Sequence, residues 1–261
     1  MNFKKQNIAG LLWALLWLSA THSAFANPEG GQVAAGAATI TSSGPKLDVV
    51  QQTDKAVIDW RSFDIQTNEH TEFHQPSSSS AVLNRVNSTD PSRLLGMLTA
   101  NGNVTIVNPN GVFIGHDAKI DVNGLIATSA NIKNENFMAG DLRFDEPGNL
   151  DASIINEGTI TAKDSGLFGL VAPNVENHGV INARLGRVEL ASGDSFTVDM
   201  YGSGLYGIKV SDAVKKQIVS NTGSINADGG TIAITAAAGS QIVNSLVTVK
   251  GELKAPVMQN R

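Results

Sequence analysis

The sequence has 261 residues, with 19 Lys and Arg against 24 Asp and Glu, so its formal net charge at pH 7 is −5. An acidic chain lacks the basic surface on which electrostatically driven nucleic-acid binding depends, so no nucleic-acid partner is expected. The chain contains no Cys, which excludes disulfides, thiolate nucleophiles and thiolate metal sites. Apolar residues make up 41% of the chain, enough to fill a core.

The first 26 residues have the three parts of a secretory signal peptide. They begin with two nearby lysines, continue with the uncharged apolar run Ile8 to Ala20, and end on Ala24-Phe25-Ala26, a cleavage site of the A-x-A type. The apolar run has 13 residues, whereas about 20 are needed to span a bilayer. We therefore predict a signal peptide at 1–26, read by the general secretory machinery, and one exported domain at 27–261. An uncleaved membrane anchor is the alternative.

Two histidines four residues apart, His70 and His74, flank Glu72 in a segment that is interpreted as extended or looped. A zinc-protease motif needs Glu directly after the first His, and it needs a helix. Neither condition is met here. We interpret the pair as solvated loop histidines and expect no metal ion and no cofactor.

The sharpest turn signal in the chain is Asn108-Pro109-Asn110-Gly111. Proline sets its own φ near −65°, and glycine can adopt a positive φ. The chain is therefore predicted to reverse here between two apolar strands.

Two sequence units recur with a shared period near 21 residues. The first has the form N-x-G-x-I-x-A, with offsets of 21 and 44 residues, and the second is a strand-like run that follows a Gly, with offsets of 20 and 44. Two independent units with one period are hard to produce by chance. The first unit starts at Asn156, Asn177 and Asn221 and, in degraded form, at Val249; the second starts at Gly166, Gly186 and Gly230.

The repeats predict an all-β fold, a parallel β-helix with coils of about 21 residues. Coils that rise ~4.8 Å each would give about eleven coils and a rod of about 50 Å. Ile160, Ile181 and Ile225 hold one position in three copies and should stack on an inner face, whereas Thr159 and Val180 should point outward. Asn side chains are expected to form ladders at the turns. A β-sandwich is the alternative, but it has no reason to keep a coil-length period.

The segment Gly202 to Gly207 matches the pattern G-x-G-x-x-G. A dinucleotide site needs a helix after this pattern, and the residues that follow, Ile208 to Val210, are typical of a strand. We interpret the segment as a Gly-rich turn.

Several segments together carry a resemblance to a known family. The densest is Leu94 to Gly115, which contains the Asn-Pro-Asn-Gly turn, and an Asn-Pro-x-Gly segment also opens the exported part at Asn27. The chain resembles the N-terminal secretion domain of filamentous-haemagglutinin-like exoproteins, the two-partner secretion family. The remaining segments that carry the resemblance are Thr53 to Ile65, Phe73 to Val86, Gly124 to Ala127 and Gly166 to Asp199.

The resemblance implies a right-handed parallel β-helix with an N-terminal cap and extra-helical hairpins. It also implies export through the periplasm to the cell surface or medium of a Gram-negative bacterium. The expected partner is a cognate outer-membrane β-barrel transporter with periplasmic receptor domains. We expect Asn108, Pro109, Asn110 and Gly111 to fix the reversal between two coils and so to shape the surface that this transporter recognises. No catalytic residue is expected.

Other functions stay open at this point. The chain could act directly as a surface adhesin through a β-helix face, with a host-surface glycan or protein as its partner. It could also be a truncated remnant of a longer adhesin or contact-dependent toxin. A polysaccharide-processing enzyme would need acidic residues clustered on one strand face, and the acidic residues of this chain are scattered at predicted turns.

Overall fold

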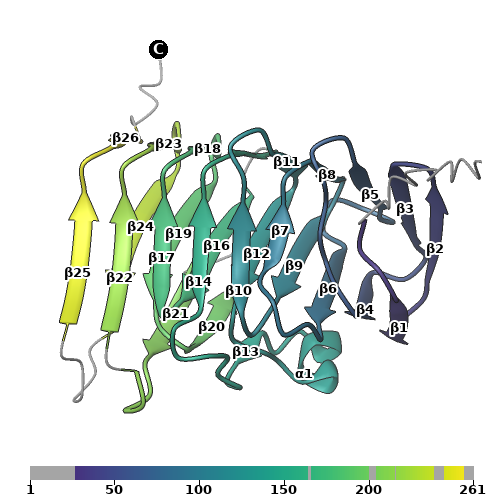
Figure 1. The fold of residues 1–261 in the computed structure, drawn as a ribbon, viewed down its shortest axis with the longest axis horizontal. Coiled ribbons are helices and arrows are strands. Elements are labelled where there is room, and N and C mark those ends of the chain that lie inside the picture. Colours follow the sequence, from purple (N-terminus) through teal and green to yellow (C-terminus); the bar gives the residue numbers. More distant parts are fainter. Residues whose placement is uncertain (1–26, 164–165, 200–203, 215, 238–243, 256–261) are drawn as a thin grey trace, which may run out of the picture.

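A computed structural model shows a rod built from three long sheets that wind around one continuous apolar core (Figure 1). The long sheets contain eight, nine and six strands, and a fourth sheet of three strands lies outside the winding. The predicted signal peptide at 1–26 lies outside the described residues and stays a prediction. The structure describes residues 27–261 except 164–165, 200–203, 215, 238–243 and 256–261.

The strands of the long sheets are short, with bounds as follows. The eight-stranded sheet contains β1 (Gln32–Ala35), β4 (Lys55–Trp60), β6 (Ala81–Val86), β9 (Asn103–Val107), β12 (Gly124–Thr128), β16 (Leu167–Ala172), β19 (Arg187–Ser192) and β24 (Thr231–Ala236). The nine-stranded sheet contains β2 (Ala38–Ser43), β3 (Lys46–Gln51), β5 (His70–His74), β8 (Met97–Ala100), β11 (Lys119–Val122), β15 (Thr159–Ala162), β18 (Val180–Asn182), β23 (Ser224–Asn226) and β26 (Glu252–Lys254). The six-stranded sheet contains β7 (Ser92–Leu94), β10 (Gly111–Ile114), β14 (Ser153–Asn156), β17 (Asn174–Asn177), β22 (Lys216–Asn221) and β25 (Asn244–Val249).

Each complete coil of the rod contributes one strand to each long sheet. In one coil, β10, β11 and β12 belong to the six-, nine- and eight-stranded sheets in turn. In the next coil, β14, β15 and β16 pair in parallel with these three strands, in the same order. This coil-on-coil pairing confirms the predicted parallel β-helix and excludes the sandwich.

The N-terminal end of the rod is closed by an antiparallel cap. β1 pairs antiparallel with β4, and β2 pairs antiparallel with β3, which confirms the cap that the resemblance implies. Inside this end of the core, the indole Nε1 of Trp60 donates a 2.9 Å hydrogen bond to Oδ1 of Asn84. Both side chains are buried, and the bond satisfies polar groups that would otherwise be costly inside an apolar core.

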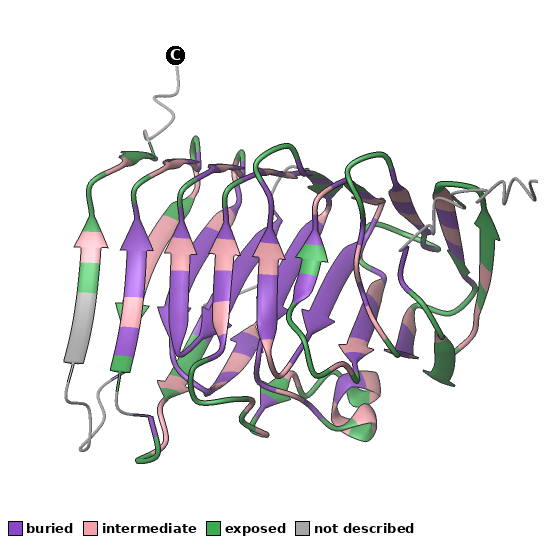
Figure 2. Ribbon diagram, viewed as in Figure 1, coloured by how far each residue is buried: buried purple, intermediate pink, exposed green. Residues whose placement is uncertain are grey.

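The core follows from the alternation of inward and outward side chains in each strand. Ile160 lies directly opposite Ile181, and Ile181 lies opposite Ile225, all three with no exposed surface. Thr159 and Val180 pair beside them and are partly exposed, as predicted. Figure 2 shows buried residues continuing from strand to strand along the rod.

The N-x-G repeat has a physical explanation at the corner between the six- and nine-stranded sheets. The buried side chains of Asn156, Asn177 and Asn221 form the predicted ladder, with Nδ2 to Oδ1 distances of 2.7 and 2.6 Å. Two residues later, a Cβ on Gly179 would lie 2.1 Å from the carbonyl oxygen of Gly158. A side chain there would hold the coils apart, so the repeat keeps glycine where the coils approach most closely.

Two excursions leave the winding, and because they use residues that would otherwise form coils, the rod has fewer coils than the sequence predicts. The first carries α1 (Asn134–Ala139) and β13 (Arg143–Phe144), and the second is the hairpin of β20 (Ser195–Asp199) and β21 (Gly204–Lys209). β13 pairs antiparallel with β20, so both excursions join in the three-stranded sheet. The predicted extra-helical hairpin is confirmed. The expected number of eleven coils is wrong, because an offset of 44 residues spans one coil with an excursion and not two coils.

Among the described residues, α1 is the one helix, and it has six residues. The described part of the chain contains no helix with the length and hydrophobicity that a membrane span requires.

We expect Ile181→Asp to destabilise the domain by about 3 kcal/mol or more, because it places an unpaired carboxylate between two coils. Val180→Asp, one residue earlier on the outer face, should cost less than about 1 kcal/mol. Denaturant unfolding of the purified domain measures both changes. A larger loss for Val180→Asp would show that the inward and outward faces are assigned the wrong way round.

Candidate recognition surface

The predicted recognition residues, Asn108 to Gly111, form a corner between β9 and β10. β9 belongs to the eight-stranded sheet and β10 to the six-stranded sheet, so the corner joins two faces of the winding. The corner lies between two coils, as predicted, because β9 ends one coil and β10 begins the next. The predicted reversal is wrong, because β9 pairs with strands of other coils and not with β10, so the chain turns from one sheet to the next without folding back.

Asn108 is the centre of this corner and is fully buried. Its Nδ2 donates to the carbonyl oxygen of Asp90 and to Oγ of Ser92, both at 3.1 Å. Its Oδ1 accepts a 2.9 Å hydrogen bond from the backbone N–H of Asn110. The backbone N–H of Gly111 donates to its carbonyl oxygen at 2.8 Å. One side chain thus closes the turn and ties it to the preceding coil.

The other three residues bind the neighbouring segments on both sides. Asn110 Nδ2 donates to the carbonyl oxygen of Ser88 at 2.8 Å, and Asn110 Oδ1 accepts a hydrogen bond from Asn149. The carbonyl oxygen of Pro109 accepts a 2.9 Å hydrogen bond from the backbone N–H of Asn149. Gly111 has a φ of +103°, as the sequence predicts, and a Cβ on it would lie 2.2 Å from the carbonyl oxygen of Ser153.

These contacts limit what the corner can offer a partner. Asn108 and Gly111 are buried, whereas Pro109 and Asn110 keep part of their surface exposed. A partner that contacts the folded corner can therefore reach Pro109 and Asn110 directly. Asn108 and Gly111 set the position of these two residues.

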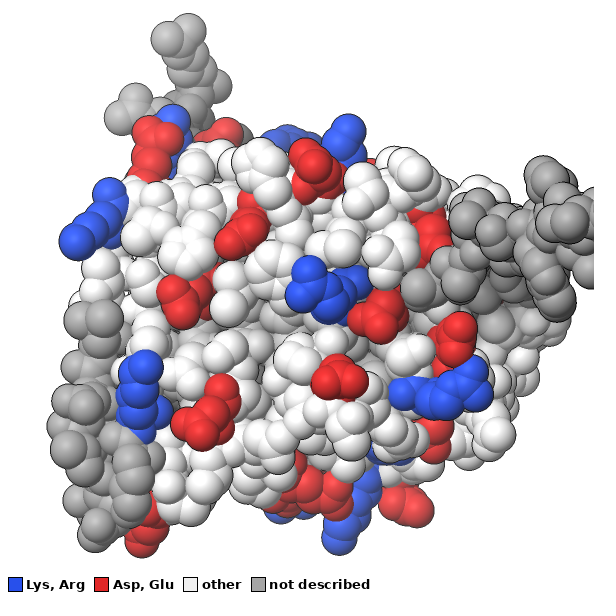
Figure 3. Space-filling view, in the orientation of Figure 1, with Lys and Arg blue, Asp and Glu red and all other residues white. Residues whose placement is uncertain are grey.

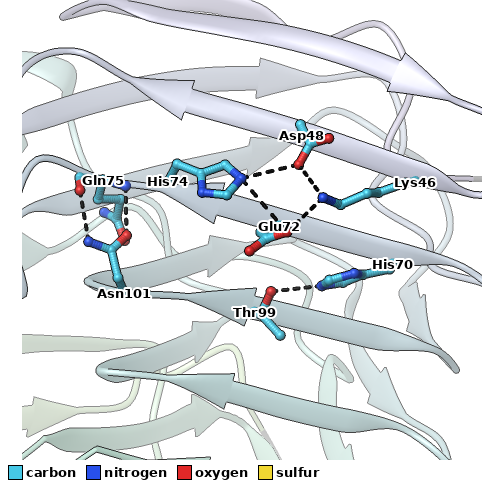
Figure 4. A network of polar contacts seen from close by, with 8 residues as sticks. All are labelled: Lys46, Asp48, His70, Glu72, His74, Gln75, Thr99 and Asn101. Atoms are coloured by element: carbon cyan, nitrogen blue, oxygen red, sulfur yellow. Dashed lines mark hydrogen bonds and ion pairs between the residues drawn. The ribbon is translucent and has the colours of Figure 1, made fainter.

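A second polar feature lies on the outer face of the nine-stranded sheet, near the cap (Figure 4). Lys46 Nζ lies 2.9 Å from Oδ1 of Asp48 and 2.8 Å from Oε2 of Glu72. His74 Nε2 lies 3.2 Å from the same oxygen of Asp48, and His70 Nε2 lies 2.7 Å from Oγ1 of Thr99 on β8. We call Lys46, Asp48, Glu72 and His74 the Lys46 network.

The network places the histidines differently from the sequence interpretation. Both lie on strand β5, so the prediction of loop histidines is wrong. Alternation along a strand puts His70, Glu72 and His74 on one face, and the parallel pairing of β3 with β5 brings Asp48 beside them. Lys46 and Asp48 lie more than twenty residues before Glu72, so no local sequence pattern shows that these side chains meet.

The charges of the network shift its pKa values. The hydrogen bonds that Lys46 donates lower the pKa of Glu72 and the pKa of Asp48. The same bonds, first that to Glu72 and then that to Asp48, raise the pKa of Lys46. Burial lowers the pKa of His70. Ligand atoms of Asp48, Glu72 and His74 lie within 4.8 Å of one another and could hold a metal ion, but the ammonium group of Lys46 already supplies a cation to both carboxylates.

The remaining candidate residues have structural roles or lie partly outside the description. Residues 202 and 203 of the Gly-rich segment are not among the described residues, whereas Gly204 to Gly207 lie in β21. His178 directly follows Asn177 of the asparagine ladder and has two polar partners of its own. Its Nδ1 lies 2.6 Å from Oγ1 of Thr222, and its Nε2 lies 3.1 Å from Oε2 of Glu176.

Charge is dispersed on the face of the rod shown in Figure 3. Acidic and basic side chains are scattered there singly or in small groups of mixed sign, and most of the surface between the groups is uncharged. This face has no large field of one sign of the kind that steers a highly charged partner.

Comparison with known proteins identifies the family. Residues 24–261 match the family model of the TPS secretion domain, which covers the whole β-helix. The chain belongs to this family. The heme/hemopexin-binding protein of Haemophilus influenzae is 35% identical over 232 residues, which is 85% of this chain and 25% of that protein. A second protein of that name from Haemophilus influenzae is 32% identical over 241 residues, 84% of this chain and 26% of its own length.

A solved structure agrees with the family assignment. The crystal structure of the HMW1 secretion domain from Haemophilus influenzae superposes with a TM-score of 0.72 and 32% identity, and the match covers 87% of this chain and 64% of that one. The TPS domain described here is therefore a secretion-targeting module of an exoprotein, in a family of secretion domains and not of enzymes. The chain spans about a quarter of the length of the curated relatives it matches.

Membership of the TPS family has consequences for location and partner. A TPS secretion domain implies export across the outer membrane of a Gram-negative bacterium, to the surface or the medium. It also implies a cognate outer-membrane transporter.

Substitutions at two glycines with positive φ distinguish two causes of destabilisation, backbone strain and overlap between neighbouring coils. Gly111→Ala should destabilise the TPS domain by about 3 kcal/mol or more, because it adds both strain and an overlap with the Ser153 carbonyl group. Gly44→Ala is the matched control. Gly44 has a φ of +57° but nothing within 4 Å of an added Cβ, so its cost should stay near 1 kcal/mol. Equal losses in denaturant unfolding would show that the corner does not need close approach of the coils.

The Lys46 network predicts a pH dependence with a definite sign. Lys46→Met should raise the pKa values of Asp48 and Glu72 toward their ordinary values, as followed by NMR titration of the carboxyl groups. Because the folded-state pKa values are lowered, the stabilisation by Lys46 exists above the unfolded-state pKa values and is lost as pH falls through the folded-state values. Lys119→Met on β11 is the control and should leave both carboxyl titrations unchanged. Unchanged titrations in Lys46→Met would contradict the network.

Proposed function

We propose that this TPS domain is the part of a longer exoprotein that a cognate outer-membrane transporter recognises through its periplasmic receptor domains. The observation that carries the proposal is the match of residues 24–261 to the TPS secretion domain. The exported domain begins at residue 27, after a signal peptide that the general secretory machinery reads. The domain itself has no catalytic role and uses no cofactor.

We also propose where recognition takes place. The corner at Asn108 to Gly111 presents Pro109 and Asn110 at the surface, and its buried hydrogen bonds hold them in place. Asn110 is bonded to Ser88 on one side and Asn149 on the other. The corner therefore presents a surface that depends on three successive segments, and we assign transporter recognition to it.

The longer protein is proposed to act as a surface adhesin, with a host-surface glycan or protein as its partner. The support is the likeness to secretion domains of exoproteins and the length of the relatives, of which this chain spans about a quarter. The heme and hemopexin binding in the names of these relatives belongs to much longer proteins, of which this chain spans about a quarter.

Secretion with and without the transporter tests the proposal. Residues 1–261 expressed with the cognate transporter should reach the medium or cell surface, and without it they should stay in the periplasm. Immunoblots of the periplasmic, surface and medium fractions measure this distribution. Equal delivery in both strains would contradict transporter-dependent export.

A pair of proline variants localises recognition within the same assay. Pro109→Ala removes ring atoms at the half-exposed corner and should lower secretion, whereas Pro91→Ala at an exposed position nearby should not. Thermal unfolding of both purified variants separates recognition from stability. Equal secretion of the two variants at equal stability would remove recognition from the corner and leave transporter-dependent export standing.

A further inference from the structure

A cavity of about 390 Å³ lies on the outer face of the eight-stranded sheet. Ala81 on β6, Thr105 on β9 and Ile126 on β12 form part of its floor. Its walls come from the two excursions, with lining residues on α1, β13, β20 and β21. We call this space the outer-face cavity. It lies on a different sheet from the Lys46 network, and the corner at Asn108 to Gly111 does not line it.

The walls of the outer-face cavity are apolar and well supported. Phe137 of α1, Phe144 of β13 and Val198 of β20 line it and are almost fully buried in the protein. The ring of Phe144 stacks on Phe196, with ring centres 4.7 Å apart and the planes within 2° of parallel. These residues belong to a second apolar cluster, separate from the core of the rod, that fixes the excursions on the sheet.

Arg85 on β6 holds the first excursion at a fixed distance from the sheet. Its guanidinium group donates to Asp59 Oδ1 at 2.9 Å, to Asn131 Oδ1 at 2.8 Å, to the carbonyl oxygen of Ile132 at 2.7 Å and to Asn134 Oδ1 at 2.8 Å. The planar fork of arginine fixes the direction of each bond. The cavity is thus preformed, which lowers the entropy cost of filling it.

Among the described residues, one charged side chain at the cavity keeps hydrogen-bond donors for a ligand. Lys55 Nζ donates to the carbonyl oxygen of Met138 at 3.1 Å, and an ammonium group has two further donors. Asp199 also lines the cavity, but it already has an interaction partner. Tyr206 lines it as well and is 49% exposed, so its side chain lies where the cavity opens to solvent and can contact a ligand there.

We propose that the outer-face cavity binds a small amphipathic anion. The apolar body of the ligand packs against Ala81, Leu142 and the ring of Tyr206, the apolar lining residues that keep part of their surface exposed, and its carboxylate or equivalent group accepts hydrogen bonds from Lys55. Sites for small molecules span about 300–1,000 Å³ and combine an apolar lining with a few polar groups. The cavity is near the lower end of this range, so it fits a single short alkyl or aromatic chain. This activity is independent of secretion.

Titration with two amphiphiles of equal chain length and opposite charge tests the proposal. Isothermal titration calorimetry uses the purified domain with decanoate and with decyltrimethylammonium, both below the concentrations at which they form micelles. We expect one decanoate per domain and at least about tenfold weaker binding of the cation. Equal binding of both compounds, or no binding of decanoate, would overturn the proposed anion site.

Matched variants place the ligand in the cavity. Ala81→Leu fills the floor and Lys55→Gln removes the ammonium group, and each should weaken decanoate binding by about tenfold or more. Ala34→Leu, at an exposed position of β1, should leave the affinity for decanoate unchanged. Lys55→Arg should bind decanoate more tightly than Lys55→Gln and nearly as tightly as wild type, because the charge and donors remain.

Thermal unfolding and the NMR shifts of Phe137 and Phe144 provide the second readout. If Lys55→Gln unfolds at the same temperature as wild type but binds decanoate more weakly, the result supports the contact between Lys55 and the carboxylate. If Ala81→Leu is folded and binds decanoate like wild type, the ligand lies elsewhere and the inference fails. If Lys55→Arg binds decanoate as weakly as Lys55→Gln, the Lys55 ammonium group only holds α1 in place through Met138, and the proposed contact between Lys55 and the anion is wrong.

Discussion

Parallel hydrogen bonding between successive coils is the constraint on which the rest of this structure depends. Neighbouring strands of a sheet lie ~4.8 Å apart, so each coil must bring its corners as close to the next coil as its strands. Glycine at 158, 179, 223 and 251 satisfies this demand, since a Cβ on each would overlap the backbone of the coil before it. The asparagine ladder beside these glycines satisfies its own buried polar groups from coil to coil. The corners therefore set the register, and the register builds the core.

The same register decides what the surface can do. Inward positions are filled by the continuous apolar core, so recognition and ligand binding are left to outward columns, corners and excursions. The corner at Asn108 to Gly111 uses most of its polar atoms internally and presents a fixed surface. The excursions pack a second apolar cluster against the sheet and enclose the outer-face cavity. The proposed recognition corner and the proposed ligand cavity thus lie on different parts of one scaffold.

Periodicity in the sequence was enough to predict the β-helix, the stacking of Ile160, Ile181 and Ile225 and the asparagine ladder, because these features repeat with the coil. It failed where the period is broken. An offset of 44 residues looks like two coils, although it holds one coil and an excursion. Contacts such as Arg85 with Asn134, or Trp60 with Asn84, join residues that share no repeat. Only the folded register brings them together.

Cross-linking between coils tests the in-register stacking most directly, because the chain has no native Cys. Thr159 and Val180 are direct neighbours on adjacent coils, whereas Asn182 is opposite Thr161. A disulfide needs Cα atoms about 4.4–6.8 Å apart, and a pair displaced by two residues is separated by about 8 Å. Secreted protein with Thr159→Cys and Val180→Cys, reduced and then reoxidised, should form the disulfide readily. The pair Thr159→Cys and Asn182→Cys should not. Equal or faster oxidation of the second pair would contradict the register from which the whole account is built.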